Sequence, residues 1–217
     1  MIRAANLRSG YIQDDVEQYL YELLPERDAV ASEMELYAEQ HRVPIIGPAV
    51  ARLLALFVEV SGAKRIFEMG SAIGYSTIWL ARAAGPKGKV HYTDGDPANA
   101  QRARGYFRRA GLAKRIDVQV GDALELLKKT PGKFDLIFND IDKHAYPESL
   151  PVIQEKLRPG GVLIVDNLLW HGQIFDATDQ TADTTGVRDF TRRMTTDPGW
   201  ITTIVPIRDG VLVAYKV

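Results

Sequence analysis

The pattern of apolar and polar positions changes near residue 64 of the chain. Before that point, apolar residues recur at steps of three and four over residues 14–40, which predicts one or two amphipathic helices broken near Pro25. A further helix is predicted over residues 49–60, where apolar residues surround nearly the whole axis. Beyond residue 64, short apolar runs alternate with helical segments, which indicates a sheet interleaved with helices.

Five apolar runs predict strands at residues 65–70, 89–94, 116–121, 134–140 and 161–167. The helical segments between them lie at roughly residues 75–84, 97–110, 123–129 and 146–157. Strands that alternate with helices form right-handed crossovers and a parallel sheet covered on both faces. Two further strands, 201–207 and 211–217, flank Asp209-Gly210, which is a strong hairpin signal. We therefore expect an α/β fold with a Rossmann-like, doubly wound, mostly parallel seven-stranded sheet, a C-terminal antiparallel hairpin and N-terminal helices.

Length and composition fit a single domain of 217 residues, with an N-terminal helical extension at 1–60 and a core at 61–217. A net charge of −1 gives no electrostatic reason to expect nucleic acid or a membrane as partner. The absence of cysteine excludes disulfides and thiolate metal sites. Residues 1–20 hold no apolar run of signal-peptide length, and no stretch of about 18 apolar residues occurs, so we expect a cytoplasmic protein.

Residues 176–186 are polar and poor in apolar anchors. The segment follows the last predicted parallel strand and precedes the hairpin. It is interpreted either as a solvated loop or as a lid on the substrate side of the sheet, and the sequence leaves both open.

Ligands of doubly wound sheets bind beyond the carboxyl ends of the strands. At the end of the first predicted strand, Gly70 and Gly74 allow a tight turn in which the backbone approaches a ligand closely. Glu68 precedes this turn, where a carboxylate would repel a phosphate but can pair with an ammonium group. The turn alone is also compatible with a purely structural role.

The next two strand ends strengthen the case for a nucleotide-like ligand. Asp94 ends the second strand, about twenty residues past the glycine turn, where a carboxylate can accept both hydroxyls of a ribose. Asp96, followed by proline, is expected to begin a helix instead. Asp122 ends the third strand, and it can lie beside an adenine edge, cap the following helix, or do both.

The fourth and fifth predicted strands carry a second group of polar residues. Asp140 lies at the end of the fourth strand with Asp142 two residues later, and Asp166 and Asn167 end the fifth. Two carboxylates and an amide suit Mg²⁺, which keeps its other positions for water or substrate oxygens. Taken singly, each carboxylate could cap a helix or bind water, whereas together they favour a metal site. The histidine spacing and the lack of cysteine disfavour zinc.

These features resemble S-adenosylmethionine-dependent methyltransferases, and more narrowly the catechol and caffeoyl-coenzyme A O-methyltransferase family, over residues 40–217. The run FEMGSAIGYSTIWLA, the acid at the second strand end and the later GDA carry the resemblance, and Gly-Tyr-Ser is typical of that branch. The implied cofactor is S-adenosyl-L-methionine. Glu68 and Ser76 would hold its methionine end, Asp94 its ribose and the Ala123 region its adenine. Ile46 and Gly47 match a segment that closes over the cofactor, although Val50 replaces a usual glycine. The expected cofactor-binding residues are Ile46, Glu68, Gly70, Gly74, Tyr75, Ser76, Asp94, Asp122, Ala123, Asp140 and Asp142.

The same resemblance implies that Asp140, Asp166 and Asn167 bind Mg²⁺ or another divalent cation such as Ca²⁺ or Mn²⁺. Such a cation lowers the pKa of a catechol hydroxyl, and Lys143 then accepts the proton as the catalytic base. We expect the pKa of Lys143 to fall beside a metal and a sulfonium. Asp142 positions either the cofactor or this lysine. Lys143, Asn167 and Trp170 are expected to contact the substrate, although a core position for Trp170 is also compatible with the sequence.

We therefore expect an S-adenosylmethionine-dependent O-methyltransferase that methylates one hydroxyl of a catechol-type small molecule with help from a divalent cation. A methyltransferase of RNA or protein on the same fold is the alternative, disfavoured by the near-neutral charge and the paired metal-site strand ends. A non-catalytic cofactor-binding module is a third, against which Lys143 and the oxygen ligands argue. The acceptor, the regiochemistry and the physiological cation stay open. A homodimer is expected, because the N-terminal helices offer surplus apolar surface and members of the resembled branch are commonly dimers.

Overall fold

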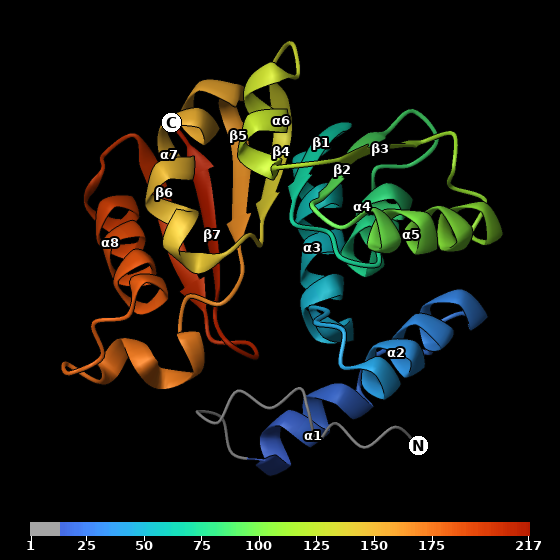
Figure 1. Ribbon diagram of the computed structural model, residues 1–217, viewed down its shortest axis with the longest axis horizontal. Helices are drawn as coiled ribbons and strands as arrows, with labels where there is room; N and C mark the ends of the chain where they lie inside the picture. The colour runs from blue at the N-terminus through green and yellow to red at the C-terminus, as the bar shows by residue number, and fades with distance from the viewer. Residues whose placement is uncertain (1–13) are drawn as a thin grey trace.

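A computed structural model describes residues 14–217, which fold around a seven-stranded sheet with strand order β3-β2-β1-β4-β5-β7-β6 (Figure 1). The strands are β1 (Arg65–Met69), β2 (Lys89–Asp94), β3 (Ile116–Val120), β4 (Phe134–Asn139), β5 (Leu157–Val165), β6 (Trp200–Val205) and β7 (Val211–Lys216). The α-helices are α1 (Asp14–Glu22), α2 (Ala29–His41), α3 (Gly47–Ser61), α4 (Tyr75–Ala83), α5 (Pro97–Arg109), α6 (Ala123–Lys129), α7 (Tyr146–Lys156) and α8 (Ala182–Thr196). Two 3₁₀ segments, η1 (Lys143–Ala145) and η2 (Trp170–Phe175), follow β4 and β5.

The predicted sheet is confirmed. Strands β1 to β5 pair in parallel, and β7 inserts antiparallel between β5 and β6. The strand order reverses between β1 and β4, which are hydrogen-bonded neighbours. In open parallel sheets, this reversal leaves a crevice at the carboxyl ends of the strands, where ligands bind.

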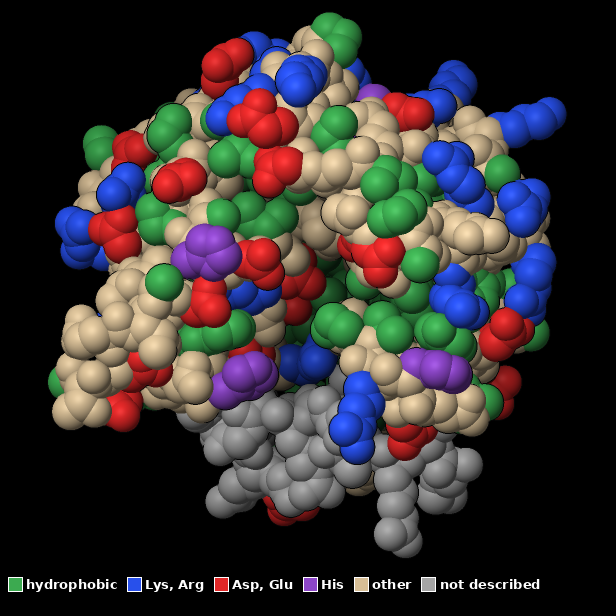
Figure 2. All heavy atoms as spheres, in the orientation of Figure 1, with side chains coloured by type: hydrophobic (Ala, Val, Ile, Leu, Met, Phe, Trp, Pro, Cys, Tyr) green, Lys and Arg blue, Asp and Glu red, His purple; other side chains and the backbone are tan. Residues whose placement is uncertain are grey.

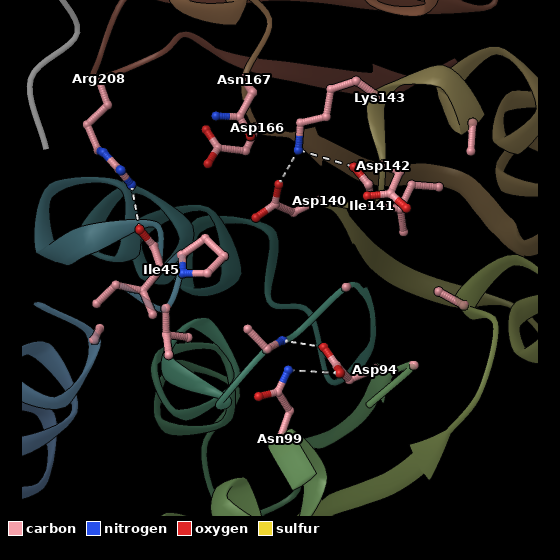
Figure 3. A pocket seen from close by; sticks show the side chains of 18 of the residues that line it. Ile45, Asp94, Asn99, Asp140, Ile141, Asp142, Lys143, Asp166, Asn167 and Arg208 are labelled. Carbon is pink, nitrogen blue, oxygen red and sulfur yellow. Dashed lines mark hydrogen bonds and ion pairs between the residues drawn. The ribbon is translucent and has the colours of Figure 1, made fainter. Parts of the chain in front are cut away.

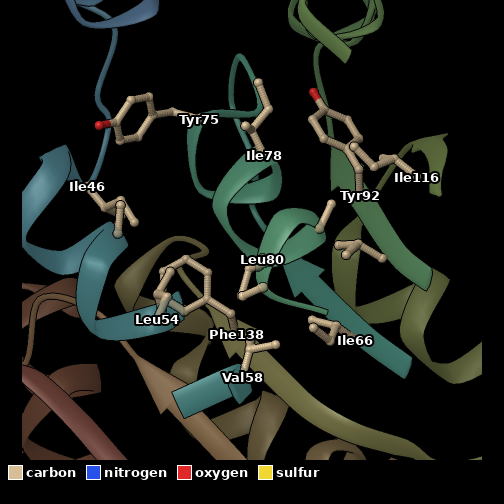
Figure 4. Packing of buried hydrophobic residues seen from close by; sticks show 14 of the residues in the cluster. Ile46, Leu54, Val58, Ile66, Tyr75, Ile78, Leu80, Tyr92, Ile116 and Phe138 are labelled. Carbon is tan, nitrogen blue, oxygen red and sulfur yellow. The ribbon is translucent and has the colours of Figure 1, made fainter. Parts of the chain in front are cut away.

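Alternate residues of the central strands face two separate hydrophobic cores. On β1, Ile66 packs with α3, α4 and α5, whereas Phe67 packs with α6, α7 and α8. The same alternation places Phe138 of β4 in the first core, beside Leu54 of α3 (Figure 4), and Ile137 in the second. Helices therefore cover both faces of the sheet, as its apolar strand runs predicted.

Helix α2 lies against α4 and α5, while α1 contacts α3. Asp28 caps α2 and pairs with Arg82 of α4. Glu33 on α2 forms an ion pair with Arg109 of α5. The two predicted helices of residues 14–40 are confirmed with a break at Pro25, while residues 1–13 of the expected extension lie outside the described residues. Among the described residues, no helix has the length and apolar character to cross a membrane.

Two boundaries differ from the sequence-based expectation. Strand β5 begins at Leu157, four residues before the predicted run, because Leu157 already pairs with Phe134 of β4. Residues 182–186, expected within a loop, form the first turns of α8. Threonine and aspartate disfavour helix, but Val187 and Phe190 of α8 are fully buried against the sheet, and this packing outweighs the local preference.

Candidate active site

A cavity of about 1290 Å³ opens at the carboxyl ends of the parallel strands. This volume exceeds the ~300–1,000 Å³ typical of a pocket for one small ligand, so two small molecules can share it. Figure 2 shows the hollow on one face of the molecule, with acidic and basic side chains around it. The predicted site residues that line the cavity are Gly70, Asp94, Asp122, Ala123, Asp140, Asp142, Lys143, Asp166, Asn167 and Trp170.

The turn after β1 joins the two groups of predicted residues. Gly70 has φ +79°, and a Cβ atom there would lie 2.4 Å from the backbone oxygen of Asp140. The backbone N–H of Asp140 donates to the carbonyl of Met69 at 2.8 Å. Only glycine permits this approach, so Gly70 holds the β1 turn directly against the start of the acidic segment after β4.

Asp94 is fixed at the end of β2 by three donors. Its carboxylate accepts the backbone N–H groups of Ala72 at 2.8 Å and Asp96 at 2.9 Å, and the Asn99 side-chain amide at 3.1 Å (Figure 3). Asp96 caps α5 through Ala98 N–H, as predicted. The Asp94 carboxylate is therefore held rigidly at the cavity wall, where it can accept further hydroxyl donors.

Asp122 combines its two predicted positions. It caps α6 by accepting the N–H of Glu125 at 2.8 Å, and it also lines the cavity. Ala123 lies next to it on the first turn of α6 and lines the cavity as well. These residues place the start of a helix at the cavity wall.

Glu68 is completely buried beneath the turn and does not line the cavity. It accepts a hydrogen bond from the Thr77 hydroxyl, while its Oε1 atom has no partner. Burial raises the pKa of Glu68 to about 7. A buried carboxylate oxygen without a donor suits an ammonium group, which is the chemistry predicted for this position.

Four other residues expected at the cofactor do not line the cavity: Ile46, Gly74, Tyr75 and Ser76. Ile46 is buried in the core near Leu54 (Figure 4). The Tyr75 hydroxyl donates to Glu35 of α2 at 2.6 Å. A Cβ on Gly74 would lie 2.5 Å from the Phe107 ring, so this glycine permits close packing of the turn against α5.

Asp140, Asp166 and Asn167 meet at one side of the cavity (Figure 3). Asp166 is only 3% exposed, and its Oδ1 atom has no hydrogen-bond partner. Burial, reinforced by the charge of Asp140, raises the pKa of Asp166 to about 7. Among residues 14–217 no group of three or more His, Cys, Asp or Glu is arranged to hold a metal. The predicted set of Asp140, Asp166 and Asn167 provides three donor side chains only because it includes the Asn167 amide. The buried, unpartnered Oδ1 atom of Asp166 fits a cation.

Lys143 lies beside these carboxylates. Its Nζ atom donates to Asp140 Oδ1 at 2.8 Å and to the Ile141 carbonyl at 3.1 Å, and it lies 5.9 Å from the centre of the Trp170 ring. Burial alone would lower the pKa of Lys143, but the Asp140 carboxylate raises it above its usual range. The fall expected for this pKa was predicted beside a metal and a sulfonium, and it stays a prediction; within the protein itself, Asp140 is directly paired with the ammonium group.

Helix α8 supports the segment that carries Lys143. A Cβ atom on Gly186 would lie 2.4 Å from the backbone oxygen of Lys143, so α8 touches η1 without an intervening side chain. Asp183 accepts the N–H of His144 at 2.9 Å. None of residues 176–186 is among the cavity-lining residues, so in this conformation the segment supports the site from behind.

Sequence reasoning missed two residues of the β6–β7 turn, of which one lines the cavity and the other lies behind it against Asn167. Arg208 lines the cavity and donates to the Ile45 carbonyl at 2.9 Å (Figure 3). Asp209 is 5% exposed and accepts a hydrogen bond from Asn167. The Asp-Gly pair explained this turn as a hairpin, and the only additional signal was the pair of adjacent charged residues, Arg208 and Asp209, between the two strands.

Comparisons with known proteins find that this chain is similar to O-methyltransferases. The family model described as O-methyltransferase matches residues 25–217. A catechol O-methyltransferase of Niastella koreensis is 32% identical over 84% of this chain and 85% of its own length. One from Mycobacterium tuberculosis is 34% identical over 85% of each chain. The crystal structure of a Bacillus cereus O-methyltransferase in complex with SAH has a TM-score of 0.85 at 30% identity, covering 94% of this chain and 97% of that one.

This chain therefore belongs to the O-methyltransferase family. TomG of Streptomyces achromogenes, an O-methyltransferase solved in complex with SAM, superposes with a TM-score of 0.86 at 28% identity over the whole of both chains. The sequence-based prediction of an S-adenosylmethionine-dependent O-methyltransferase is confirmed at the level of the family.

Proposed function

We propose that this O-methyltransferase transfers a methyl group from S-adenosylmethionine to one hydroxyl of an ortho-dihydroxy aromatic small molecule, with a divalent cation held by Asp140, Asp166 and Asn167. The observation that supports a cation most directly is that Asp166 Oδ1 is buried without a hydrogen-bond partner, next to a second carboxylate and an amide. Oxygen donors of this kind favour Mg²⁺, Mn²⁺ or Ca²⁺. The names of the N. koreensis and M. tuberculosis relatives support the acceptor class.

The cofactor would occupy the side of the cavity formed by β1 to β3. Asp94 accepts the ribose hydroxyls while its three protein donors keep it oriented. The first turn of α6, at Asp122 and Ala123, borders the adenine. Glu68, with its unpartnered oxygen below the turn, receives the ammonium group. Methyl transfer is an in-line displacement at the sulfonium methyl, so the acceptor must lie on the opposite side, toward β4 and β5.

The acceptor side is shaped for deprotonation of a hydroxyl. A bound divalent cation would lower the pKa of the acceptor hydroxyls and orient them. Lys143 would take the released proton, and Trp170 would border the ring of the acceptor. Asp140 holds the Lys143 ammonium group at 2.8 Å. Sharing Asp140 with a cation weakens this ion pair, which lowers the pKa of Lys143 toward the range in which it can act as a base.

The acceptor class is tested with matched phenols and radiolabelled S-adenosylmethionine. We expect methylation of 4-methylcatechol in the presence of Mg²⁺ and none of 4-methylphenol, because only the catechol offers two adjacent oxygens. Equal methylation of both compounds would contradict the ortho-dihydroxy requirement. Methylation of neither, in a wider panel of ortho-diphenols, would direct the search to another acceptor class.

We also propose that the protein forms a homodimer through its N-terminal region. Apolar side chains stand exposed on α1 and directly after it, where Tyr19 and Leu23 are 60% and 63% exposed, and on α3, where Val60 is 76% exposed. Clusters of this kind mark association surfaces. Light scattering should give about twice the chain mass, and a mass near 24.2 kDa would reject the dimer.

A further inference from the structure

Asp209 lies outside the proposed cation site, but it contacts one of its three donors. Its side chain is 7% exposed, and Asn167 Nδ2 donates to Asp209 Oδ2 at 3.0 Å. The other carboxylate oxygen, Oδ1, accepts the backbone N–H of His171 at 2.6 Å. Both oxygens of this buried carboxylate are therefore committed to nitrogen donors.

A carboxylate only accepts hydrogen bonds, whereas an amide offers a donor on one side and an acceptor on the other. Asn167 must therefore turn its nitrogen toward Asp209, and its oxygen is left on the opposite side of the amide plane. The described residues provide no hydrogen-bond donor to that oxygen. Because cations bind the oxygen of an amide and are repelled by its NH₂ group, the orientation of Asn167 decides whether it can act as a ligand.

Asp209 can impose this orientation because its own position is tightly determined. The Leu169 N–H donates to the Asp209 carbonyl at 2.8 Å, and the Leu168 N–H donates to the Gly210 carbonyl at 2.9 Å. Gly210 has φ +80°, and a Cβ there would lie 2.5 Å from Leu169 Cγ. The β6–β7 turn is thus locked onto the segment that follows Asn167.

We propose, on the basis of the proposed cation site, that Asp209 is a positioning residue that presents the Asn167 oxygen to the divalent cation. It does so by accepting the Asn167 amide nitrogen while the fixed His171 N–H occupies its second oxygen. Asp209 itself need not touch the cation, the cofactor or the acceptor. Outer-shell partners of this kind typically change metal affinity by about 10–100-fold when they are lost.

The Asp209→Asn variant distinguishes orientation from simple packing. An asparagine at 209 has one acceptor oxygen, and the backbone N–H of His171, which cannot rotate, would take it. The NH₂ group of the new side chain would then face Asn167. The Asn167 amide would turn its oxygen toward residue 209, which would leave the Asn167 NH₂ group facing the cation. Exchanging the partners, in Asp209→Asn/Asn167→Asp, restores a donor–acceptor pair and again leaves an oxygen for the cation.

The test is calorimetric titration of Mg²⁺ and Mn²⁺ into EDTA-treated full-length protein, with S-adenosylmethionine affinity and melting temperature measured in parallel. We expect Asp209→Asn to weaken cation binding by about 10–100-fold, and the double exchange to restore at least the wild-type affinity. Cofactor affinity should stay unchanged in both variants.

Three outcomes would overturn the role of Asp209. Unchanged cation affinity in Asp209→Asn would show that it does not orient Asn167. Weak binding in both the single variant and the double exchange would show that Asp209 only maintains the turn. Absence of cation binding by the wild-type protein would remove the cation site itself, and this result is distinct from the other two because it precedes any substitution.

Discussion

The two sides of the cavity hold their polar residues by different kinds of contact. On the side of β1 to β3, Asp94 is held by Asp96 and Asn99, two and five residues away, and by one more distant donor, Ala72, 22 residues away, while Asp122 is held by Glu125, three residues away. On the side of β4 and β5, Lys143 pairs locally with Asp140, three residues away, but Asn167 is held by Asp209, 42 residues away, and Arg208 contacts Ile45, 163 residues away. The cofactor side is thus built largely from local turns and caps, and the cation side from tertiary contacts.

This difference predicts that substitutions on the two sides affect cofactor binding and cation binding separately. Changes on the cofactor side should weaken binding of S-adenosylmethionine and leave cation binding intact. Changes on the cation side should do the reverse, since the direct contact between the two sides at Gly70 is made by backbone atoms of Asp140.

The largest effect is expected from removal of a proposed cation ligand. Asp140→Ala or Asp166→Ala should reduce Mg²⁺-stimulated methyl transfer to the level of EDTA-treated wild-type protein, because both acceptor orientation and hydroxyl activation depend on the cation. The readouts are turnover with labelled S-adenosylmethionine and cofactor affinity by calorimetry. Glu155→Ala, at an exposed acid near the end of α7, is the matched control. Full Mg²⁺-dependent turnover in both aspartate variants would contradict the ligand assignment.

Loss of the proposed base should reduce the rate of methyl transfer less than loss of a cation ligand, because the cation would stay bound. Lys143→Ala should slow the chemical step by about 10²–10⁴-fold, the usual contribution of a general base. Raising the pH should recover part of the rate, since catecholate then forms in solution. Single-turnover rates across pH, with cation and cofactor affinities measured alongside, provide the check. A wild-type rate at neutral pH in this variant would end the base assignment.

Replacement of Asp94 probes the cofactor side. Asp94→Ala should weaken S-adenosylmethionine binding by about 1.5–3 kcal/mol, as for a lost hydrogen bond to a charged group. Cation affinity should not change. Unaltered cofactor affinity by calorimetry would place the ribose elsewhere in the cavity.

A smaller effect is expected when the contact between α8 and the backbone of Lys143 is disturbed. Gly186→Ala places a Cβ atom 2.4 Å from the Lys143 carbonyl oxygen, so helix and loop must move apart. We expect a loss of about 1–3 kcal/mol of folding free energy, as for overpacking, together with slower turnover. Gly105→Ala on α5, where a Cβ meets nothing within 4 Å, should instead gain about 0.5–1 kcal/mol. Denaturant unfolding of both variants gives the comparison, and equal stabilisation of the two would show that the α8 contact can relax.

A further effect is expected on stability as a function of pH. Burial raises the pKa of Asp166 to about 7 in the folded protein, above its value in the unfolded chain. The folded state therefore binds more protons between about pH 4 and 7, and this contribution to stability is lost as the pH rises through 7. Cation-free wild-type protein should lose more stability between pH 5 and 8 than Asp166→Asn does. Identical pH dependence in melting experiments would show that Asp166 titrates normally.

The contrast between the two sides also explains what the sequence could predict. Strand-end residues such as Asp94, Asp140 and Asp166 follow recognisable apolar runs, and the parallel topology brings them to one edge. Asp122 was identifiable as both a cap and a cavity residue for the same local reason. The sheet and its hairpin followed from alternation and from Asp209-Gly210.

The tertiary supports could not be predicted from local patterns. The first turns of α8 are rich in threonine and aspartate, and they become helical because Val187 and Phe190 are buried. The role of Gly186 depends on the position of Lys143, 43 residues earlier in the chain. The pairing of Lys143 with Asp140, which raises rather than lowers the lysine pKa, depends on a side-chain contact that spacing suggests but does not specify.

The most direct test of the proposed function is a titration of Mg²⁺ into EDTA-treated wild-type protein while methylation of 4-methylcatechol is followed. The account predicts negligible turnover without the cation and a saturable rise on its addition, with no rise in Asp166→Ala. Full turnover of the catechol in EDTA would contradict it, because Asp140, Asp166 and Asn167 would then have no cation-dependent part in the reaction.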